Sequence, residues 1–498
     1  MNTLLILGNQ LFDVQLIPKE LKITSVFMKE DLNLCTHFKY HKLKIAFFLS
    51  AMRKYAQELN EKKIAVHYEK LTKKDLSFSN SLKNYLSEKN ITNLYCYEIE
   101  DKFFEKEISE LCIKNKVLLH FIPSPMFLSS REDFRNYLST TKKPFMKTFY
   151  ERQRKKFKVL VDKDLKPEGG QWSFDEENRK PLPKNYQAPT LERYKADKID
   201  QEVHLVVNHF FSKHPGNTDH TWLPTDRISA QKWLDIFIKE RLEMFGAYED
   251  ALSKDSDIIH HSALTPFLNA GLLTPQEVVK KVLIEFKKKK LPLNSVEGFI
   301  RQVIGWREFI RGIYQNFSEK QDSTNFWNHH QSLTSHWYNG TTGIEPLDDV
   351  IKKTERLGYA HHIERLMIVG SLMLILEIDP FEGHKWFMEM FIDSSDWVMG
   401  PNVYGMALFS DGGIFATKPY FCGSNYYRKM GKYKTTDWQD GVDGLYWSFI
   451  EKNKNFFSKN PRMSMMVKTV EKMPADKKNR IYKAAEIIKN KITEKKKS

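Results

Sequence analysis

The stretch VEGFIRQVIGWREFIRGIY, residues 296–314, repeats apolar residues at the spacing of an α-helix. One stripe of this helix carries Ile300, Val303, Ile304, Ile310 and Ile313, whereas Arg301, Arg307, Glu308 and Arg311 lie elsewhere. A single apolar stripe is typical of a helix that packs against other helices. The segments Thr225–Tyr248 and Thr274–Lys289 behave similarly, each opening on an N-cap residue or an early Pro. We therefore expect residues 201–498 to form a large all-helical domain.

Residues 1–130 alternate short apolar runs with charged stretches of helical spacing. The runs are Leu4–Leu7, Ser25–Met28, Ile64–Tyr68, Asn93–Tyr97 and Val117–Ile122, and the intervening stretches are His41–Asn60, Ser79–Lys89 and Phe104–Asn115. Such alternation predicts an α/β domain with a parallel, Rossmann-like sheet covered by helices. Ligands of these sheets bind beyond the carboxyl ends of the strands, which points to Gly8-Asn9-Gln10 and Met28-Lys29-Glu30. No GxGxxG follows the first run, so a dinucleotide is not expected there.

Between these parts the pattern dissolves into charges and turns. The segment KKFKVLVDKDLKPEGGQWSFDEENRKPLPKNYQAP, residues 155–189, shows this best. Loops of this length in compact proteins often carry function. We interpret residues 131–200 as an inter-domain linker and predict boundaries near 130 and 200.

Composition narrows the functional classes. The chain has 498 residues, 13% of them aromatic, and a net charge of +15, which favours a polyanionic partner such as nucleic acid. The four cysteines, with no CxxC pair, argue against a disulfide framework or a cysteine-bound metal. The longest apolar run, Leu366–Leu376, is too short to cross a bilayer, and the first residues do not form a signal peptide. We expect a soluble, cytoplasmic protein.

Several long motifs resemble the photolyase/cryptochrome superfamily. The helical half contributes HHSALTPFLNAGLL (260–273), the stretch 296–314 and GYAHHIERLMIVGSLMLIL (358–376). The segments WVMGPNVYGMALFSDGGIFATKPY (397–420), GGQWSFDEENRKPLP (169–183), LILGNQL (5–11) and YHKLKIAFFLSAMRKYA (40–56) are similar to its prokaryotic branch. That branch comprises the photolyase-related proteins, among them the bacterial (6-4) photolyases.

The resemblance implies a function and its cofactors. It implies FAD in the helical domain, a 6,7-dimethyl-8-ribityllumazine antenna in the α/β domain, and light-driven repair of (6-4) photoproducts. The alternatives are a cryptochrome-type blue-light photoreceptor, which is not an enzyme, and a photolyase for cyclobutane pyrimidine dimers. The expected partner is ultraviolet-damaged DNA, with no membrane. We expect a monomer associated with the nucleoid in a bacterial cytoplasm.

Lesion-facing residues also follow from the resemblance. His361 and His362 match a catalytic pair, because an imidazole can donate the proton that the electron-injected lesion needs. An ordinary imidazole titrates near neutrality, so repair is expected to depend on pH there. Tyr420 resembles a tyrosine that stacks on an extruded base. Asp175 and Asp250 match acids near the lesion, where Mg²⁺ could bind, although surface acids are the commoner outcome.

The resemblance assigns further residues to the flavin. Gln302, Trp306 and Arg307 are expected on a helix between the flavin and the lesion, with Trp306 lining a cavity rather than filling the core. The expected flavin contacts are Ser262, Leu264, Thr265, Asn269, Gln302, Arg311, Asp393 and Asn402. Amides and carboxylates around the ring would tune its electronics. N-capping alone would require some of the same residue types near Ser262, and Asn402 after Pro401 could be only a turn residue.

Two tryptophans and four antenna residues complete the expected sites. Trp386 and Trp337 resemble the residues that pass electrons to the photo-excited flavin, whereas most of the 10 tryptophans would be ordinary core. Gly8, Gln10, Glu30 and Tyr40 are compatible with the antenna. Asn9 stands where an acid is expected, which weakens that assignment.

The sequence departs from the branch at its iron–sulfur cluster. The four cysteines that hold a 4Fe–4S cluster there would lie within Ile344-Glu345-Pro346, at both ends of Lys434-Thr435-Thr436-Asp437, and near Gly441. None of these positions is a cysteine, and Cys422 alone cannot hold the cluster. We therefore expect no iron–sulfur cluster.

Overall fold

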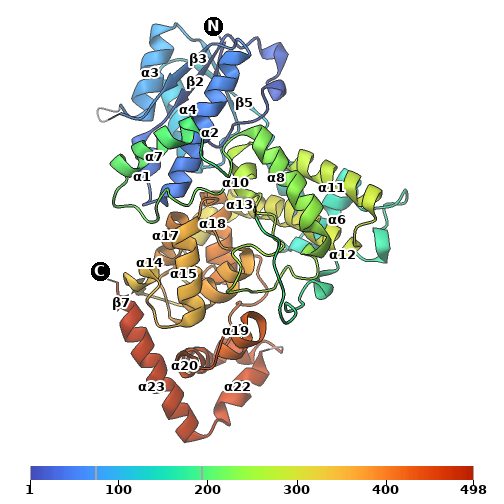
Figure 1. Cartoon of the computed structure of the whole chain (residues 1–498), viewed down its shortest axis with the longest axis vertical. Coiled ribbons are helices and arrows are strands. Elements are labelled where there is room, and N and C mark those ends of the chain that lie inside the picture. The colour runs from blue at the N-terminus through green and yellow to red at the C-terminus, as the bar shows by residue number, and fades with distance from the viewer. Residues whose placement is uncertain (1, 73–75, 192–193, 462, 497–498) are drawn as a thin grey trace.

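The computed structural model of the chain describes residues 2–72, 76–191, 194–461 and 463–496. Its N-terminal part is a parallel five-stranded sheet in the order β3-β2-β1-β4-β5, at the top of Figure 1. The strands are β1 (Asn2–Leu5), β2 (Ser25–Lys29), β3 (Val66–Glu69), β4 (Asn93–Tyr97) and β5 (Leu118–Ile122). Leu4 pairs with Val26 of β2 and with Tyr95 of β4. The predicted parallel sheet is confirmed.

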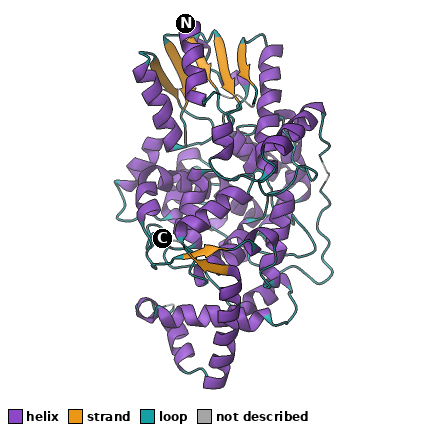
Figure 2. Ribbon diagram, turned by 90° about the vertical axis from the view of Figure 1, so that its left-hand side faces the viewer, coloured by secondary structure: helices purple, strands orange, loops and turns teal. Residues whose placement is uncertain are grey.

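Helices cover both faces of this sheet (Figure 2). Leu4 packs in one core with α2 (Lys42–Glu61), and Leu5 packs in another with α3 (Phe78–Glu88) and α4 (Lys102–Lys114). Because successive strand residues point to opposite faces, strands covered on both sides are apolar throughout. The short elements η1 (Val14–Leu16), η2 (Lys19–Leu21) and α1 (Leu32–Thr36) complete this part.

The segment 131–200 is more ordered than a linker. It contains α5 (Arg131–Leu138), α6 (Met146–Phe157), η3 (Glu168–Gly170) and η4 (Asp175–Glu177), and α7 (Lys198–Phe210) begins within it. The expectation of turns throughout is wrong for 131–157. Phe134 and Phe149 are buried against Phe309 and hold α5 and α6 on the helical part. The many charges of both helices hid these few apolar anchors.

The rest of the chain is mainly helical, as predicted. Before residue 340 lie α8 (Arg227–Glu240), α9 (Leu242–Phe245), α10 (Thr265–Ala270), α11 (Pro275–Lys289), α12 (Leu293–Ile300), η5 (Arg301–Arg307), α13 (Glu308–Ser323), β6 (Gln331–Leu333) and α14 (His336–Asn339). After it come α15 (Glu345–Leu357), η6 (Glu364–Gly370), α16 (Ser371–Ile375), α17 (Pro380–Met390), α18 (Asp396–Gly400), η7 (Pro401–Ala407), α19 (Ser424–Gly431), α20 (Trp438–Lys452), α21 (Lys454–Ser458), α22 (Ser464–Glu471), α23 (Ala475–Ile492) and β7 (Thr493–Lys495). No helix among the described residues combines the length and apolar character that a membrane span needs.

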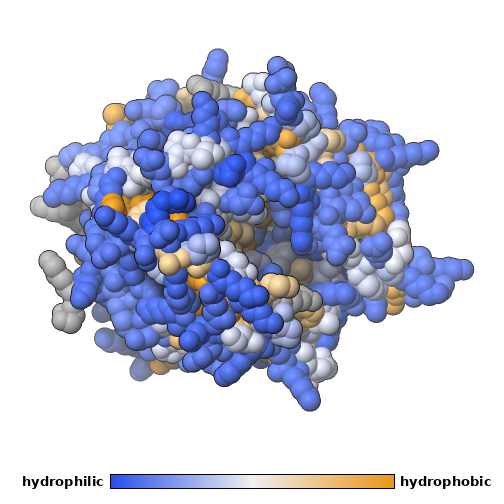
Figure 3. Space-filling model, turned by 90° about the horizontal axis from the view of Figure 1, so that it is seen from below, coloured by the Kyte–Doolittle hydropathy of each residue, from blue (hydrophilic) through white to orange (hydrophobic). Residues whose placement is uncertain are grey.

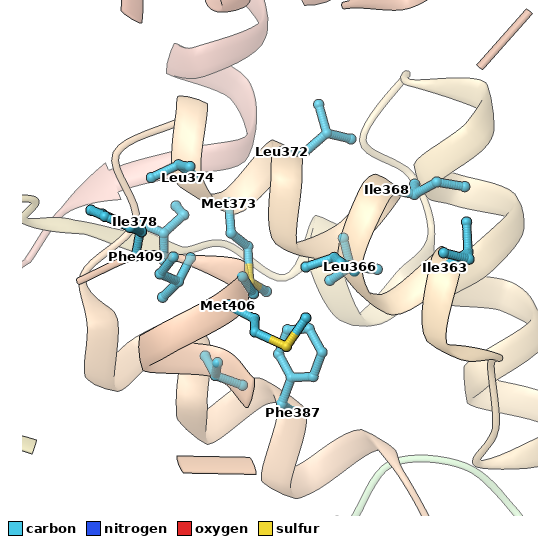
Figure 4. Close-up of a cluster of buried hydrophobic side chains, with 14 of the residues drawn as sticks. Ile363, Leu366, Ile368, Leu372, Met373, Leu374, Ile378, Phe387, Met406 and Phe409 are labelled. Atoms are coloured by element: carbon cyan, nitrogen blue, oxygen red, sulfur yellow. The ribbon is translucent and has the colours of Figure 1, made fainter. Parts of the chain in front are cut away.

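The helical core is built around three π-helices, η5, η6 and η7. Figure 4 shows Leu366 of η6 and Met373 of α16 lying near Phe387 of α17 and Met406 of η7. π-helices are rare and frequently mark functional sites. The apolar run Leu366–Leu376 is thus part of the buried core of the helical part.

The C-terminal helices form a lobe at the bottom of Figure 1. Helix α23 packs along α20, and β7 pairs antiparallel with β6, with Thr493 opposite Leu333. The two helices approach closely at Gly444, where an added Cβ would collide with the carbonyl oxygen of Ile481. Only glycine allows this backbone contact.

The substitution Gly444→Ala should therefore destabilise the fold. Because backbone must move to admit the methyl group, we expect a loss of about 1–3 kcal/mol in the free energy of unfolding. The matched control is Gly400→Ala, where the nearest atom to a new Cβ is 3.8 Å away. The control should be neutral or stabilising by about 0.5 kcal/mol. Denaturant melts of both variants check this, and equal stabilities would contradict the close packing of α20 and α23.

Candidate active site

A cavity of about 580 Å³ lies within the helical part. Its wall comes from α6, the segment Trp172–Arg179, α10, and the π-helices η5, η6 and η7. Cavities of this size hold small-molecule cofactors. The lining includes thirteen of the side chains that the sequence assigned to the sites: Asp175, Asp250, Ser262, Leu264, Thr265, Asn269, Gln302, Trp306, Arg307, His362, Asp393, Asn402 and Tyr420.

Asp393 joins three parts of the cavity wall. Its carboxylate accepts hydrogen bonds from the hydroxyl of Thr265 at 2.5 Å and from the guanidinium of Arg365 at 2.9 and 3.2 Å. Its backbone carbonyl accepts a bond from the amide of Asn269 at 2.8 Å. Asp393 itself is only 5% exposed, and these bonds fix α10 against η6.

Arg307 continues this network on the opposite wall. Its guanidinium donates to the Oδ1 of Asn269 at 2.6 Å and stacks over the ring of Trp397. Burial lowers the pKa of Arg307 to about 10, so the side chain stays charged at neutral pH. Its Nε is buried without a hydrogen-bond partner among the described residues.

Another part of the cavity wall is formed by Ser262, Leu264 and Asn402. Leu264 is buried, and the backbone carbonyl of Ser262 accepts a hydrogen bond from the indole of Trp233. The side-chain amide of Asn402 donates to the Val398 carbonyl at 2.8 Å. The carbonyl oxygen of Asn402 is therefore the atom left for a ligand.

Acidic residues gather at another end of the cavity. Glu249 accepts hydrogen bonds from Gln302 at 2.6 Å and from Asn178 at 2.9 Å, and burial raises its pKa to about 7. Burial, followed by the charge of Asp175, raises the pKa of Asp250 to about 6. Asp175 itself pairs with Arg301 at 2.9 Å and with Arg179. Glu249 and Asp175 therefore each have polar partners, and Asp250 lies close enough to Asp175 to feel its charge.

Half-buried Tyr420 lines this cavity as well, and burial raises its pKa. The described residues contain no group of three or more His, Cys, Asp or Glu side chains arranged for a metal ion. Asp175 and Asp250 are therefore not joined by a third ligand of these types.

The structure separates His361 from His362. His362 lines the cavity and has accessible surface there, although protein surrounds it deeply. His361 is 3% exposed and stacks on His261, with ring centroids 4.1 Å apart and planes 8° from parallel. Its backbone N–H donates to Glu364 at 3.1 Å. Only His362 can reach a ligand in this cavity without rearrangement.

The enclosure of His362 also changes its titration. Burial, followed by the charge of Arg365, lowers the pKa of His362 to about 4. The free protein therefore holds a neutral imidazole at pH 7. This pKa differs from that of an ordinary imidazole because protein surrounds the ring, and the expected dependence of repair on pH near neutrality stays a prediction.

Trp386 and Trp337 lie outside the cavity wall, in the core. Both are 0% exposed, and their rings are 6.5 Å apart, edge to face. The ring centroids of Trp386 and its neighbour Phe387 are 5.4 Å apart, and Phe387 lines the cavity. The pair thus forms a continuous aromatic line leading from the cavity.

The four antenna residues do not share one environment. The side chain of Gln10 donates to the carbonyls of Tyr97 and Glu98, and the carboxylate of Glu30 accepts bonds from Arg53 and Tyr68. These contacts stabilise the sheet and occupy their polar atoms. A side chain at Gly8 would press on Met52 of α2.

Tyr40 lies instead where the α/β part meets the helical part. The ammonium of Lys44 sits 3.8 Å from the centre of its ring. Burial, followed by the charges of Asp396 and Asp101, raises the pKa of Tyr40.

Comparison with known proteins identifies the family. Residues 4–223 match the family described as deoxyribodipyrimidine photo-lyase-related protein, and residues 299–441 match the FAD binding domain of DNA photolyase. The (6-4) photolyase of Agrobacterium fabrum is 33% identical over 491 residues, covering 95% of this chain and 96% of that protein. The chain belongs to the photolyase/cryptochrome family, in its photolyase-related branch.

Solved structures agree on the fold. The Synechocystis sp. PCC6803 cryptochrome has a TM-score of 0.61 and 14% identity, with 99% of each chain covered. A bacterial class III photolyase from Agrobacterium tumefaciens has a TM-score of 0.56 and 15% identity, with 98% of each chain covered. The predicted two-part photolyase fold is confirmed.

Sequence reasoning missed three charged residues of the site: Glu249, Arg301 and Arg365. Glu249 directly precedes Asp250 in AYED, and Arg365 follows His361 by one helical turn in HHIER. Arg365 holds Asp393, and Arg301 holds Asp175. A search for charged partners one turn from the assigned residues would have found Arg365.

Arg311 differs from its expected flavin role. One helical turn beyond Arg307, it faces the sheet and pairs with Glu100 at 2.7 and 3.0 Å and with Glu98 at 3.1 Å. Arg311 and Glu100 are both buried. The residue therefore joins the α/β and helical parts and does not line the cavity.

The substitution Arg311→Ala should destabilise the protein by about 3 kcal/mol, because it removes the buried, doubly bonded partner of Glu100 and leaves that carboxylate with Gln315 and the more distant Arg131. The control Arg480→Ala removes an exposed arginine paired with Asp440 at 2.9 Å and should cost less than about 1 kcal/mol. Denaturant melts measure both. FAD bound per folded molecule should stay unchanged in Arg311→Ala, and selective loss of FAD would restore the cofactor role.

Proposed function

We propose that the chain is a light-dependent (6-4) photolyase that binds ultraviolet-damaged DNA and repairs its (6-4) photoproducts with reduced FAD. The observation that carries the proposal is the meeting of His362 and Tyr420 in one cavity with the Asp393–Arg365 network. The 33% identity to a (6-4) photolyase over nearly the whole chain supports the same activity.

The residues present fit FAD. Arg307, Asn269, Asp393 and Asn402 place guanidinium, amide and carboxylate groups on the wall of a 580 Å³ cavity. These residues would hold the cofactor, and Gln302 would contact it from η5. When bound and reduced, FAD supplies an electron on excitation by blue light. Trp386 and Trp337 would carry electrons to it from the surface side.

The lesion would enter the same cavity by extrusion from the duplex. Extrusion costs a few kcal/mol and costs least at a damaged, poorly stacked site. Half-buried Tyr420 and Trp306 offer aromatic faces for the extruded base. His362, once protonated in the complex with the lesion, would donate that proton to the lesion, while His361 would hold its neighbour in place from the core.

The lysines and arginines of this basic chain would neutralise DNA phosphates. Figure 3 shows one predominantly hydrophilic face, seen from below. The protein would act as a monomer in the cytoplasm, at the nucleoid.

The antenna is proposed beside Tyr40, where the two parts meet. Lys44 and Asp101 flank this ring, and a ribityllumazine could use their polar groups. Gln10 and Glu30 would support the site indirectly, because their own polar atoms are engaged by protein. For Mg²⁺, Asp175 and Asp250 do not fit, since arginines already neutralise Asp175 and no third acidic ligand joins them within the part of the chain that the structure describes.

The decisive experiment is turnover of defined lesions under blue light. Purified protein with reduced FAD should convert an oligonucleotide carrying a (6-4) photoproduct to the intact pyrimidines, and not in the dark. Repair of cyclobutane dimers instead would identify the other photolyase class. Repair of neither lesion would favour the photoreceptor.

The two histidines should differ in this assay. His362→Ala should abolish repair while FAD remains bound, because the residues proposed to hold FAD lie on other walls of the cavity. His361→Ala should reduce repair less, because His361 stacks on His261 and does not face the ligand. Repair rates from lesion chromatography, with flavin absorbance as the control, measure the difference. Wild-type repair by His362→Ala would contradict its proton-donating role.

Iron content tests the expected loss of the cluster. We expect purified protein to contain FAD and no stoichiometric iron or sulfide. Ile344 is buried, and Gly441 packs so closely on α23 that an added Cβ would collide with Ile488. The thiol of Cys422 forms no disulfide and lies within hydrogen-bond distance of the Ser371 hydroxyl. Elemental analysis checks this, and four irons per chain would refute it.

A further inference from the structure

A tyrosine–glutamate pair lies beside the two buried tryptophans. The hydroxyl of Tyr338 donates a hydrogen bond to the Oε2 of Glu389 at 2.6 Å. Tyr338 follows Trp337 in α14, and Glu389 follows Trp386 by three residues in α17. The hydrogen bond therefore links the same two helices that hold the tryptophan pair.

The tryptophans themselves have no base to take a proton. The indole N–H of Trp386 donates to the carbonyl of Trp337 at 2.9 Å, and that of Trp337 donates to the carbonyl of Ile492 at 3.0 Å. An amide carbonyl accepts a hydrogen bond but does not retain the proton at neutral pH. With both rings 0% exposed, an oxidised tryptophan here keeps its proton and its positive charge in the core.

Glu389 offers what the tryptophans lack. It is 2% exposed, and its Oε1 has no hydrogen-bond partner among the described residues. Burial raises its pKa, which the hydrogen bond from Tyr338, the charge of Lys385, and the backbone N–H and charge of Lys39 oppose. A buried carboxylate with one unpaired oxygen gains stability when a proton neutralises it.

We propose that Tyr338 is the terminal electron donor of the tryptophan line and that Glu389 accepts its proton. This inference rests on the proposed electron transfer through Trp386 and Trp337. With light-excited, oxidised FAD as the one-electron acceptor, Trp386 would give up one electron and would be refilled from Trp337. Tyr338 then gives one electron to Trp337, its O–H bond breaks, and the proton moves to Oε2 of Glu389.

This step leaves a neutral tyrosyl radical, a protonated Glu389 and a restored Trp337. Charge no longer resides in the core, so the electron is less readily returned from the flavin. Tyr338 is half-buried, whereas Trp337 is not exposed, so a thiol in solution can reduce the tyrosyl radical. The Tyr338–Glu389 pair would thus pass electrons from reductants in solution to the buried tryptophans.

The test is flash photolysis of the holoprotein with oxidised FAD, followed by transient absorption and electron paramagnetic resonance. Wild type should show a tryptophan radical that is replaced by a tyrosyl radical. Tyr338→Phe should lose the tyrosyl signal, and its tryptophan radical should decay faster by return of the electron. Glu389→Gln, which retains a hydrogen-bond acceptor but no carboxylate base, should also lose the tyrosyl signal.

The chain offers a matched control. Tyr482 donates to Glu451 at 2.8 Å, which is the same chemical pair on α23 and α20. Tyr482→Phe should behave like wild type. A tyrosyl signal that persists in Tyr338→Phe, or a wild-type tryptophan radical that never yields a tyrosyl radical, would overturn the proposal.

Lesion repair after chemical reduction of FAD separates this proposal from the proposed function. Chemically reduced Tyr338→Phe should repair (6-4) lesions at the wild-type rate, because no electron is then drawn through the tryptophans. Failure of reduced wild type to repair refutes photolyase activity, while the radical measurement still decides the role of Tyr338. Absence of any tryptophan radical in wild type overturns the electron path and Tyr338 together.

Discussion

The carboxylate of Asp393 is the constraint on which the cavity depends. It binds Thr265 at the start of α10 and Arg365 on η6, and its backbone carbonyl binds Asn269. Asn269 in turn accepts from Arg307 on η5. Segments more than 120 residues apart in sequence are thereby fixed around one cavity. Since the network is buried and carries two arginines for one aspartate, it also gives the wall a positive character suited to an anionic cofactor.

Helix geometry explains which side chains reach that cavity. A π-helical turn is wider than an α-helical turn, so it shifts the direction of the residues that follow. In η5 this region presents Gln302 and Arg307 to the cavity. Arg311 lies one α-helical turn further on the same side, since both guanidiniums stack over Phe127, and there it pairs with Glu100. The same helix therefore serves the cofactor site with one arginine and the junction of the two parts with the next.

The sequence predicted the sheet well because its strands are buried on both faces. The apolar runs beginning at Leu4, Ser25 and Asn93 match β1, β2 and β4 within two residues at their starts. Helices α5 and α6 were missed because a few buried aromatic rings, such as Phe134 and Phe149, hold otherwise charged segments. Local pattern cannot show a partner such as Phe309, which lies far along the chain.

Most of the expected cavity residues do line the cavity, but charge partners escaped prediction. Composition cannot distinguish an arginine that lines a cofactor cavity, such as Arg307, from one paired with Glu100, such as Arg311. It also cannot separate His362 from His361, because adjacent residues of one helix point in different directions. Three-dimensional placement, and not residue type, decided each of these roles.

The pairing of β7 with β6 sets an order of events during synthesis. Trp337 is sealed by the carbonyl of Ile492, and the strand partner of residues 331–333 is made some 160 residues later. The sheet of residues 2–122 can close while translation continues. The aromatic core beneath β6 stays incomplete and partly open to water until the ribosome has released residue 495. A nascent chain stalled before that point would hold a formed N-terminal sheet beside an unsealed helical core.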